Sequence, residues 1–281
     1  MPAYDAGFKI VARVSGRALS MWGGIHCQQW EPLGGEVQAT ERLADRAFRA
    51  RDGRERFVVY MEAYTRWSKS APWSVLAKSG LLAERERLPV ESLIYVLLPR
   101  GYRPQGGTFQ LARPSGPKQQ VWFQEICLWR QEPEAWWEEA PGLMALYPLC
   151  RPGRPHREAL EYPAQVIRRG VVDSVVRADL LTTLGIFGRL MYPELPVLDL
   201  IGRTQMKESL LYQEILAEGR AEGLREAVRE VLDGRFGEEA VSEFATALSG
   251  VTDPTRLAEL HRLALHCRRI EQFRRALSGE S

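Results

Sequence analysis

Asp45 and Glu62 are two acidic residues whose spacing could bring both carboxylates to one cation. Glu62 lies inside FVVYMEAY, a run typical of a mostly buried strand, and an unpaired glutamate is almost never fully buried. Two hard oxygen ligands suit Mg²⁺ or Mn²⁺, because such a cation takes one or two protein carboxylates and completes its octahedron with water and substrate phosphate. The pair therefore predicts metal-assisted phosphodiester hydrolysis.

A β-hairpin is the element that must position these carboxylates. The dipeptide Asp52-Gly53 is a turn signal between an alternating run and a β-branched, aromatic run. If these two residues form the turn, Asp45 pairs with Tyr60 and lies diagonally from Glu62, roughly 7–8 Å away at Cα. A turn two residues longer places Asp45 directly opposite Glu62, and in both registers the two carboxylates share a face.

An ion pair is the competing interpretation of the same glutamate. Arg46 and Arg66 are close enough in sequence for either guanidinium to neutralise Glu62, and Asp45 could equally be a surface residue at a strand end. The spacing alone leaves both interpretations open.

The distribution of charge is more informative than its total. The 281 residues carry 38 Lys and Arg against 36 Asp and Glu, a net charge of +2, so bulk charge does not indicate a polyanionic partner. Basic residues gather in 42–69 and 100–118, whereas 132–139 is acidic. Such runs are usually solvated faces, and they matter here only if they surround a catalytic site.

No sequence motif indicates another kind of chemistry. The cysteines and histidines show no metal-ligand or nucleophile spacing, and no phosphate-binding glycine-rich loop occurs, which argues against a zinc site and against nucleotide hydrolysis. Four tryptophans could stack nucleobases or belong to the core: Trp122, Trp129, Trp136 and Trp137.

The periodicity predicts an α/β fold with a mixed central β-sheet flanked by helices and a C-terminal helical extension. In the first half we expect a helix over 4–20, strands over 43–50 and 57–64, a helix over 70–86, a buried strand over 91–99, a loop or hairpin with one short strand over 101–118, and a strand within 119–129. After a Pro-rich connector over 148–155, the pattern is helical, with a long amphipathic stretch over 206–237 and helices over 238–249 and 254–277. Asp253 followed by Pro254 predicts an N-cap for the last helix.

Three parts are expected along the chain: an α/β domain over 1–200, a long amphipathic connector helix over 201–234, and a small helical domain over 235–281. No stretch is long and apolar enough to span a membrane, and the N-terminus lacks a secretory signal. These features predict a cytoplasmic protein with no membrane partner.

The order of these elements resembles the PD-(D/E)XK nuclease superfamily, and within it the recombination-promoting nuclease and putative transposase family. The resemblance begins with DxxFK at Asp5, Phe8 and Lys9, and continues with ADR at 44–46, the hairpin, and a glutamate in an apolar strand. Its most specific motif is MKESLLYQEILAEGRAEGLREA at 206–227, which is similar to the helix that follows the nuclease domain in bacterial members. The resemblance covers most of the chain and implies a restriction-endonuclease-like fold.

The resemblance assigns Asp45 and Glu62 as the metal ligands of a catalytic site. The family has Lys or Gln two positions after the glutamate, and this sequence has Tyr64, which offers one neutral hydroxyl. Losing a charge-stabilising donor typically costs about 10²–10³ in rate. Arg66 or Lys69 could compensate for that loss.

Two further residues are accessory candidates. Asp5 and Lys9 lie on a helix that packs near the active site in this family, so Asp5 could join the metal shell, although a helix cap and a solvated lysine are the plainer interpretation.

Three hypotheses follow. The first is a Mg²⁺-dependent DNA endonuclease that binds the phosphate backbone of DNA through basic residues such as Arg46, Arg49 and Lys69. The second is a weakened or inactive relative, suggested by Tyr64, that serves as a DNA-binding or interaction module. The third is homo-oligomerisation through the helices of 206–277, which is compatible with either.

Overall fold

The computed structural model describes residues 3–32, 46–104, 106–113, 116–151, 153–202 and 206–278. Its internal contacts divide the chain into two units, Met1–Leu211 and Tyr212–Ser281. Within the described ranges, no helix combines the length and the apolar character needed to cross a membrane.

The first unit is built on a mixed five-stranded sheet with the order β1-β2-β3-β4-β7. Its strands are β1 (Gln29–Pro32), β2 (Arg46–Asp52), β3 (Glu55–Tyr64), β4 (Val90–Val96) and β7 (Gln124–Cys127). β1, β2 and β3 pair antiparallel, whereas β4 runs parallel to both β3 and β7. The apolar runs of β3 and β4 are buried because both faces of the sheet are covered, which is typical of parallel pairing.

The β2–β3 hairpin forms as expected, with a different turn. Asp52 pairs with Glu55, so Gly53 and Arg54 are the turn residues. Gly53 has a φ of +57°, which only glycine adopts without strain. Of the two registers expected, the pairing of Asp45 with Tyr60 is therefore wrong, because Tyr60 pairs with Ala47. The described pairs follow the other register, and Asp45 itself lies outside the described residues.

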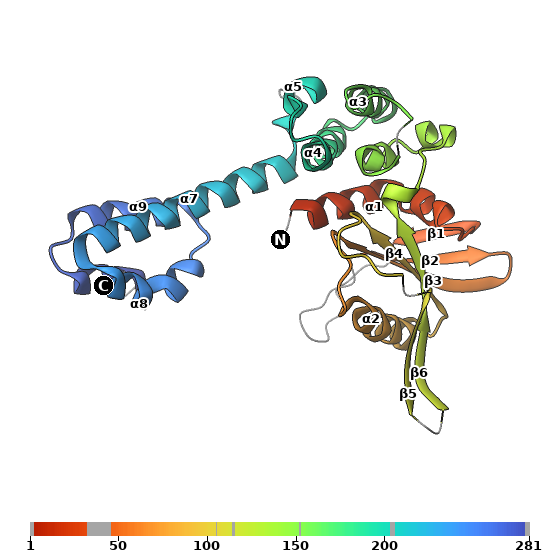
Figure 1. Ribbon diagram of the computed structural model, residues 1–281, viewed down its shortest axis with the longest axis horizontal. Coiled ribbons are helices and arrows are strands. Elements are labelled where there is room, and N and C mark those ends of the chain that lie inside the picture. Colours follow the sequence, from red (N-terminus) through yellow and green to blue (C-terminus); the bar gives the residue numbers. More distant parts are fainter. Residues whose placement is uncertain are drawn as a thin grey trace. The chain divides into compact units, whose positions relative to one another are not determined.

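Two helices cover opposite faces of the sheet, α1 (Ala3–Trp22) on one and α2 (Ala71–Glu86) on the other (Figure 1). Tyr95 of β4 points to α1, where its hydroxyl donates a 2.6 Å hydrogen bond to the Leu19 carbonyl. Its neighbours Ile94 and Val96 point to the α2 face, as the alternation of side chains along a strand requires. Alternate residues along a strand of this sheet therefore point to α1 and to α2.

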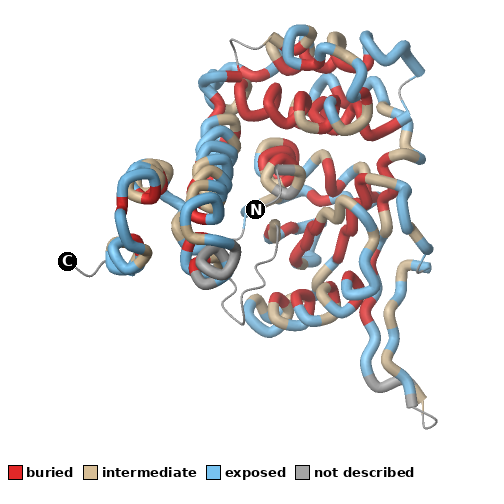
Figure 2. Tube along the Cα trace, turned by 60° about the vertical axis from the view of Figure 1, so that its left-hand side comes forward, coloured by how far each residue is buried: buried red, intermediate tan, exposed pale blue. Residues whose placement is uncertain are grey.

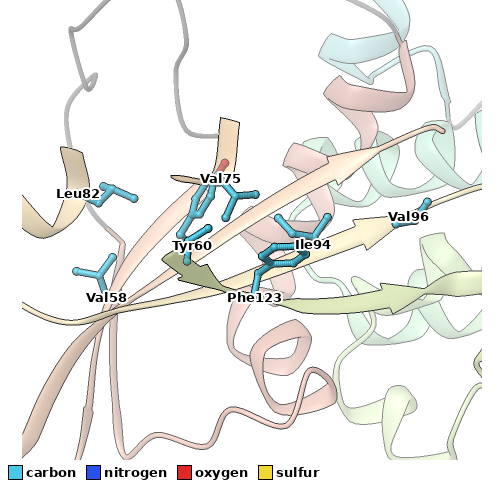
Figure 3. Close-up of a cluster of buried hydrophobic side chains, with 8 residues drawn as sticks. Val58, Tyr60, Val75, Leu82, Ile94, Val96 and Phe123 are labelled. Carbon is cyan, nitrogen blue, oxygen red and sulfur yellow. The ribbon is translucent and has the colours of Figure 1, made fainter. Parts of the chain in front are cut away.

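The α2 face encloses an apolar cluster (Figure 3). Its buried members come from β3, β4, α2 and the segment that leads to β7: Val58, Tyr60, Val75, Leu82, Ile94, Val96, Val121 and Phe123. Because Val75 and Leu82 lie two turns apart on one face of α2, both ends of this contact fix the helix against β3 and β4.

A separate two-stranded ribbon follows β4. β5 (Thr108–Arg113) pairs with β6 (Gly116–Trp122), and both contact α2 (Figure 1). The sequence predicted one short strand in 101–118 and a single strand in 119–129. That expectation is wrong, because β6 ends at Trp122 and β7 begins at Gln124 in the other sheet.

A helical layer packs on the far side of α1. It comprises the 3₁₀ helices η1 (Leu128–Arg130), η2 (Ala135–Glu139) and η3 (Leu143–Leu149), followed by α3 (Glu158–Gly170), α4 (Ser174–Met191) and α5 (Val197–Ile201). Figure 2 shows buried residues along the strands and along the helices of this layer. α4 begins where the Asp173 side chain accepts a hydrogen bond from the Val176 N–H, an N-cap that stabilises its first turn.

The second unit is helical. It contains most of α7 (Leu210–Phe236), then α8 (Glu238–Ser249), α9 (Pro254–His266) and α10 (Ile270–Ser278). Its own core includes Val228, Leu232, Phe244, Leu260 and Phe273. The single helix expected over 254–277 is broken at 267–269, whereas the N-cap expected at Asp253 is confirmed, since its carboxylate accepts from two backbone N–H groups.

Candidate active site

Glu62 is a buried acid in the central strand of the sheet, with a relative exposure of 6%. Its Oε1 lies 2.5 Å from the Lys78 Nζ and 3.5 Å from the Ser74 Oγ. Its Oε2 accepts a short hydrogen bond from the Tyr60 hydroxyl. Both carboxylate oxygens are thus satisfied by protein donors, and the charge is balanced by a buried ammonium.

Two elements position this cluster. Tyr60 and Glu62 are two residues apart on β3, so both side chains point to the α2 face. Ser74 and Lys78 are four residues apart on α2, so both point back to β3. The apolar cluster that holds α2 on the sheet therefore also fixes the distance between Glu62 and Lys78.

The partner of Glu62 is not one of those expected from the sequence. Arg46 precedes Ala47 on β2, so it lies on the α1 face, opposite to Glu62. Arg66 is exposed in the segment after β3. The sequence pattern did not pair Lys78 with Glu62, because the two residues are sixteen positions apart in the chain. The signal that could have identified it is a lysine among the apolar residues of VLAKSGLL, which indicates a buried charge that needs a partner.

Tyr64 lies on the same face as Glu62, at the position where the resembled family has lysine or glutamine. Its half-buried ring packs against the apolar cluster, and the Trp67 ring lies 6.2 Å from it. The structure therefore places an aromatic side chain at this position and a lysine from the neighbouring helix beside the glutamate.

The other three acidic and basic candidates are not brought next to Glu62 by the residues that the structure describes. Asp45 lies outside the described residues, immediately before Arg46 in the chain. Asp5 and Lys9 belong to α1, which covers the face of the sheet opposite to Glu62, and nothing is described of the Asp5 side chain.

Of the three basic residues expected to bind a polyanion, Arg49 shares the sheet face of Glu62 and is exposed. Its guanidinium forms a 2.7 Å ion pair with Glu86 at the end of α2. Burial raises the pKa of the Glu86 carboxyl, but the hydrogen bonds from Arg49 and Arg85 outweigh burial and leave this pKa below its ordinary value. Lys69 is exposed in the segment before α2, whereas Arg46 lies on the opposite face.

An open groove of 580 Å³ runs over β1–β3. Three arginines on the α2 face of the sheet contribute to its lining: Arg49, Arg51 and Arg56. Glu31 also lines the groove and Arg49 is paired with Glu86, so the lining keeps a smaller positive charge, which suits a phosphate-bearing ligand.

The donor chemistry of Glu62 fits a hard divalent cation, since a carboxylate is the ligand that Mg²⁺ takes from proteins. Within the described ranges, no group of three or more His, Cys, Asp or Glu side chains could hold a metal ion. A magnesium site here therefore depends on water, on substrate oxygens and on Asp45.

Comparisons of this chain with known protein families, with curated proteins and with solved structures find no match. The fold defines an α/β protein with a mixed five-stranded sheet flanked by helices and with helices at its C-terminal end. Its function has to be inferred from the buried acid–lysine cluster and from the surfaces around it.

Proposed function

We propose that this chain is a metal-dependent DNA endonuclease of the PD-(D/E)XK type, with Asp45 and Glu62 as its carboxylate ligands. The observation that carries the proposal is the buried Glu62 on the central strand, 2.5 Å from a buried lysine. A buried carboxylate and ammonium cost several kcal/mol per ion in desolvation, on the order of what their attraction returns, so such a pair is weak evidence for a purely stabilising role.

The arrangement of elements supports a restriction-endonuclease-like fold. A leading helix, an antiparallel hairpin that carries the glutamate, a helix, and a parallel apolar strand follow one another as the resemblance implies. Glu62 lies in the strand next to β2, whose first described residue follows Asp45 in the chain.

In this proposal Glu62 and Asp45 would hold Mg²⁺ or Mn²⁺. The bound ion would supply Lewis-acid stabilisation of the phosphodiester and lower the pKa of a coordinated water. The protein's own task is to orient the Glu62 carboxylate, which the Tyr60 hydroxyl and the Lys78 ammonium achieve by hydrogen bonding to it.

Lys78 takes the role that a lysine two positions after the glutamate has in the resembled family. Its ammonium comes from α2 instead of β3. Tyr64 occupies the β3 position where the resembled family has lysine or glutamine, and it packs against the apolar cluster. A positive charge this close to the Glu62 carboxylate stabilises negative charge that develops on the phosphate, and such a donor is worth about 10²–10³ in rate.

The proposal is tested by incubating supercoiled plasmid with the full-length protein at low salt, with Mg²⁺, with Mn²⁺ and with EDTA. We expect nicking that requires the metal and disappears in Asp45→Asn and in Glu62→Gln. Cleavage that persists in both variants, or an absence of cleavage by wild-type protein that binds the plasmid, contradicts the assignment.

A second function is favoured by two observations. Tyr64 stands where the resembled family has lysine or glutamine, and both oxygens of Glu62 already have protein donors. A catalytically weakened relative would keep the fold as a DNA-binding or oligomerising module. It predicts salt-sensitive DNA binding that Glu62→Gln leaves unchanged, with no metal-dependent nicking.

A further inference from the structure

Trp73 is a half-exposed tryptophan on α2, the helix that supplies Ser74 and Lys78 to the candidate active site. It lies in the first turn of α2, with a relative exposure of 50%. The next residue, Ser74, has its hydroxyl 3.5 Å from the Glu62 carboxylate. An exposed indole therefore directly precedes, in the chain, a residue that contacts the proposed catalytic acid.

The indole is supported from one side by the ribbon. Phe109 of β5 packs against it in a T-shaped contact, with ring centroids 5.0 Å apart and planes at 64°. Phe109 in turn packs against the apolar cluster under α2. The ring is thus braced by the core while half of the side chain remains open to solvent, which suits a stacking surface.

The chain segment around Trp73 carries positive charge. Residues 63–77 contain Arg66 and Lys69 and no acidic residue. Arg66 and Lys69 are exposed in the segment that joins β3 to α2, and the first turn of α2 has no acidic side chain. Aromatic faces next to basic side chains match a nucleotide, whose base stacks while its phosphate is attracted electrostatically.

We propose that Trp73 is a stacking platform for an unpaired base next to the bond that is cut, and that the substrate is single-stranded or locally unpaired DNA. In a duplex both faces of each base are occupied by its neighbours, so only an unstacked base reaches an indole of this kind. This inference rests on the proposed function for the position of the cut. The stacking itself is measurable without cleavage.

The test measures binding of full-length protein in EDTA at low salt. A labelled single-stranded oligonucleotide is compared with the same sequence as a duplex. Trp73→Ala and Trp73→Leu should weaken single-strand binding about tenfold or more, which is the loss expected for one stacked base, and change duplex binding less than about twofold. Trp73→Phe should restore most of the affinity, and circular dichroism establishes that each variant is folded.

Trp122 provides the matched control. It is 65% exposed on β6, but it pairs with Thr108, so it points to the ribbon face opposite to Phe109. Trp122→Ala should leave single-strand binding unchanged.

Equal losses for single strands and duplexes, no loss in Trp73→Ala and Trp73→Leu, or the same loss in Trp122→Ala would overturn the inference. The last outcome, or a Trp73→Ala effect on self-association alone, indicates a protein contact instead. If wild-type protein binds single strands through Trp73 but never cleaves, the nuclease assignment fails and the stacking inference stands. If wild-type protein cleaves DNA and neither binding nor cleavage depends on Trp73, the stacking inference fails and the nuclease assignment stands.

Discussion

The Lys78 ammonium lies 2.5 Å from the Glu62 carboxylate across the interface between α2 and β3, and both side chains are buried. An ion pair in such a position is sensitive to the loss of either partner, because the remaining charge keeps its desolvation cost without its counterion. The same pair is the centre of the proposed catalytic site.

Removing one member of this pair should destabilise the fold more than removing both. We expect Lys78→Met to lower the free energy of unfolding by about 3–5 kcal/mol, because the Glu62 carboxylate is left buried without a cation. The double variant Glu62→Gln/Lys78→Met should recover much of that loss. Urea denaturation measures both, and a single variant that loses less than about 1 kcal/mol would show that water reaches the carboxylate.

The Arg49–Glu86 pair predicts a dependence of stability on pH. The pKa of Glu86 is lower in the folded state than its ordinary value of 4.5. Its contribution is therefore fully present above pH 4.5 and is lost as the pH falls through the folded pKa. The stability difference between wild type and Glu86→Gln, measured by thermal melting, should be constant from neutral pH down to about 5 and shrink in more acidic solution. A difference that grows in acid would contradict the sign of this shift.

Asp179 holds Ser209 and the first residues of α7, all within the first unit, against α4. It is a buried residue of α4 whose Oδ1 accepts from the Ser209 hydroxyl at 2.8 Å and from the Leu211 N–H at 3.4 Å. Asp179→Ala removes this acceptor and also the 3.4 Å ion pair of its Oδ2 with Arg13, so we expect a loss of about 1–3 kcal/mol in unfolding free energy. Asp179→Asn keeps one acceptor oxygen and should lose less. Equal losses in chemical denaturation would mean that the negative charge matters more than the acceptor.

Self-association through the C-terminal helices stays a prediction. The structure limits the apolar surface of these helices that is available for it. The apolar faces of α8, α9 and α10 are already used in the core of their own unit. Leu216 and Leu265 remain 49% and 44% exposed. Leu216→Glu and Leu265→Glu should together lower the mass found by light scattering from that of an oligomer to that of a monomer. A wild-type protein that is itself monomeric would remove the basis for this expectation.

Local signals carried most of what the sequence predicted correctly about the fold. The glycine of the β2–β3 turn, the apolar run of β4 and the cap at Asp253 each act within a few residues, and each element formed. The exact turn was misplaced by one position, because both Asp52-Gly53 and Gly53-Arg54 put glycine where a positive φ is needed, and only pairing across the strands chooses between them.

Contacts between distant parts of the chain were the ones that sequence patterns missed. Glu62 was expected to need a cation, but its partner is brought by the packing of α2 on the sheet. The ribbon of β5 and β6 was only partly foreseen, because an apolar run does not say where a chain leaves one sheet and enters another. Trp73 was not singled out, since exposure is a property of the folded surface.

The central claim is that the Glu62–Lys78 cluster performs phosphodiester cleavage, and the rate of plasmid nicking in Mg²⁺ tests it most directly. Lys78→Gln is compared with wild type and with Lys207→Gln, an exposed lysine before α7, after circular dichroism has established that each protein is folded. We predict metal-dependent nicking by wild type and by Lys207→Gln, and a rate lower by about 10²–10³ in Lys78→Gln. Equal rates in all three proteins, or no nicking by wild-type protein bound to DNA, would contradict the account.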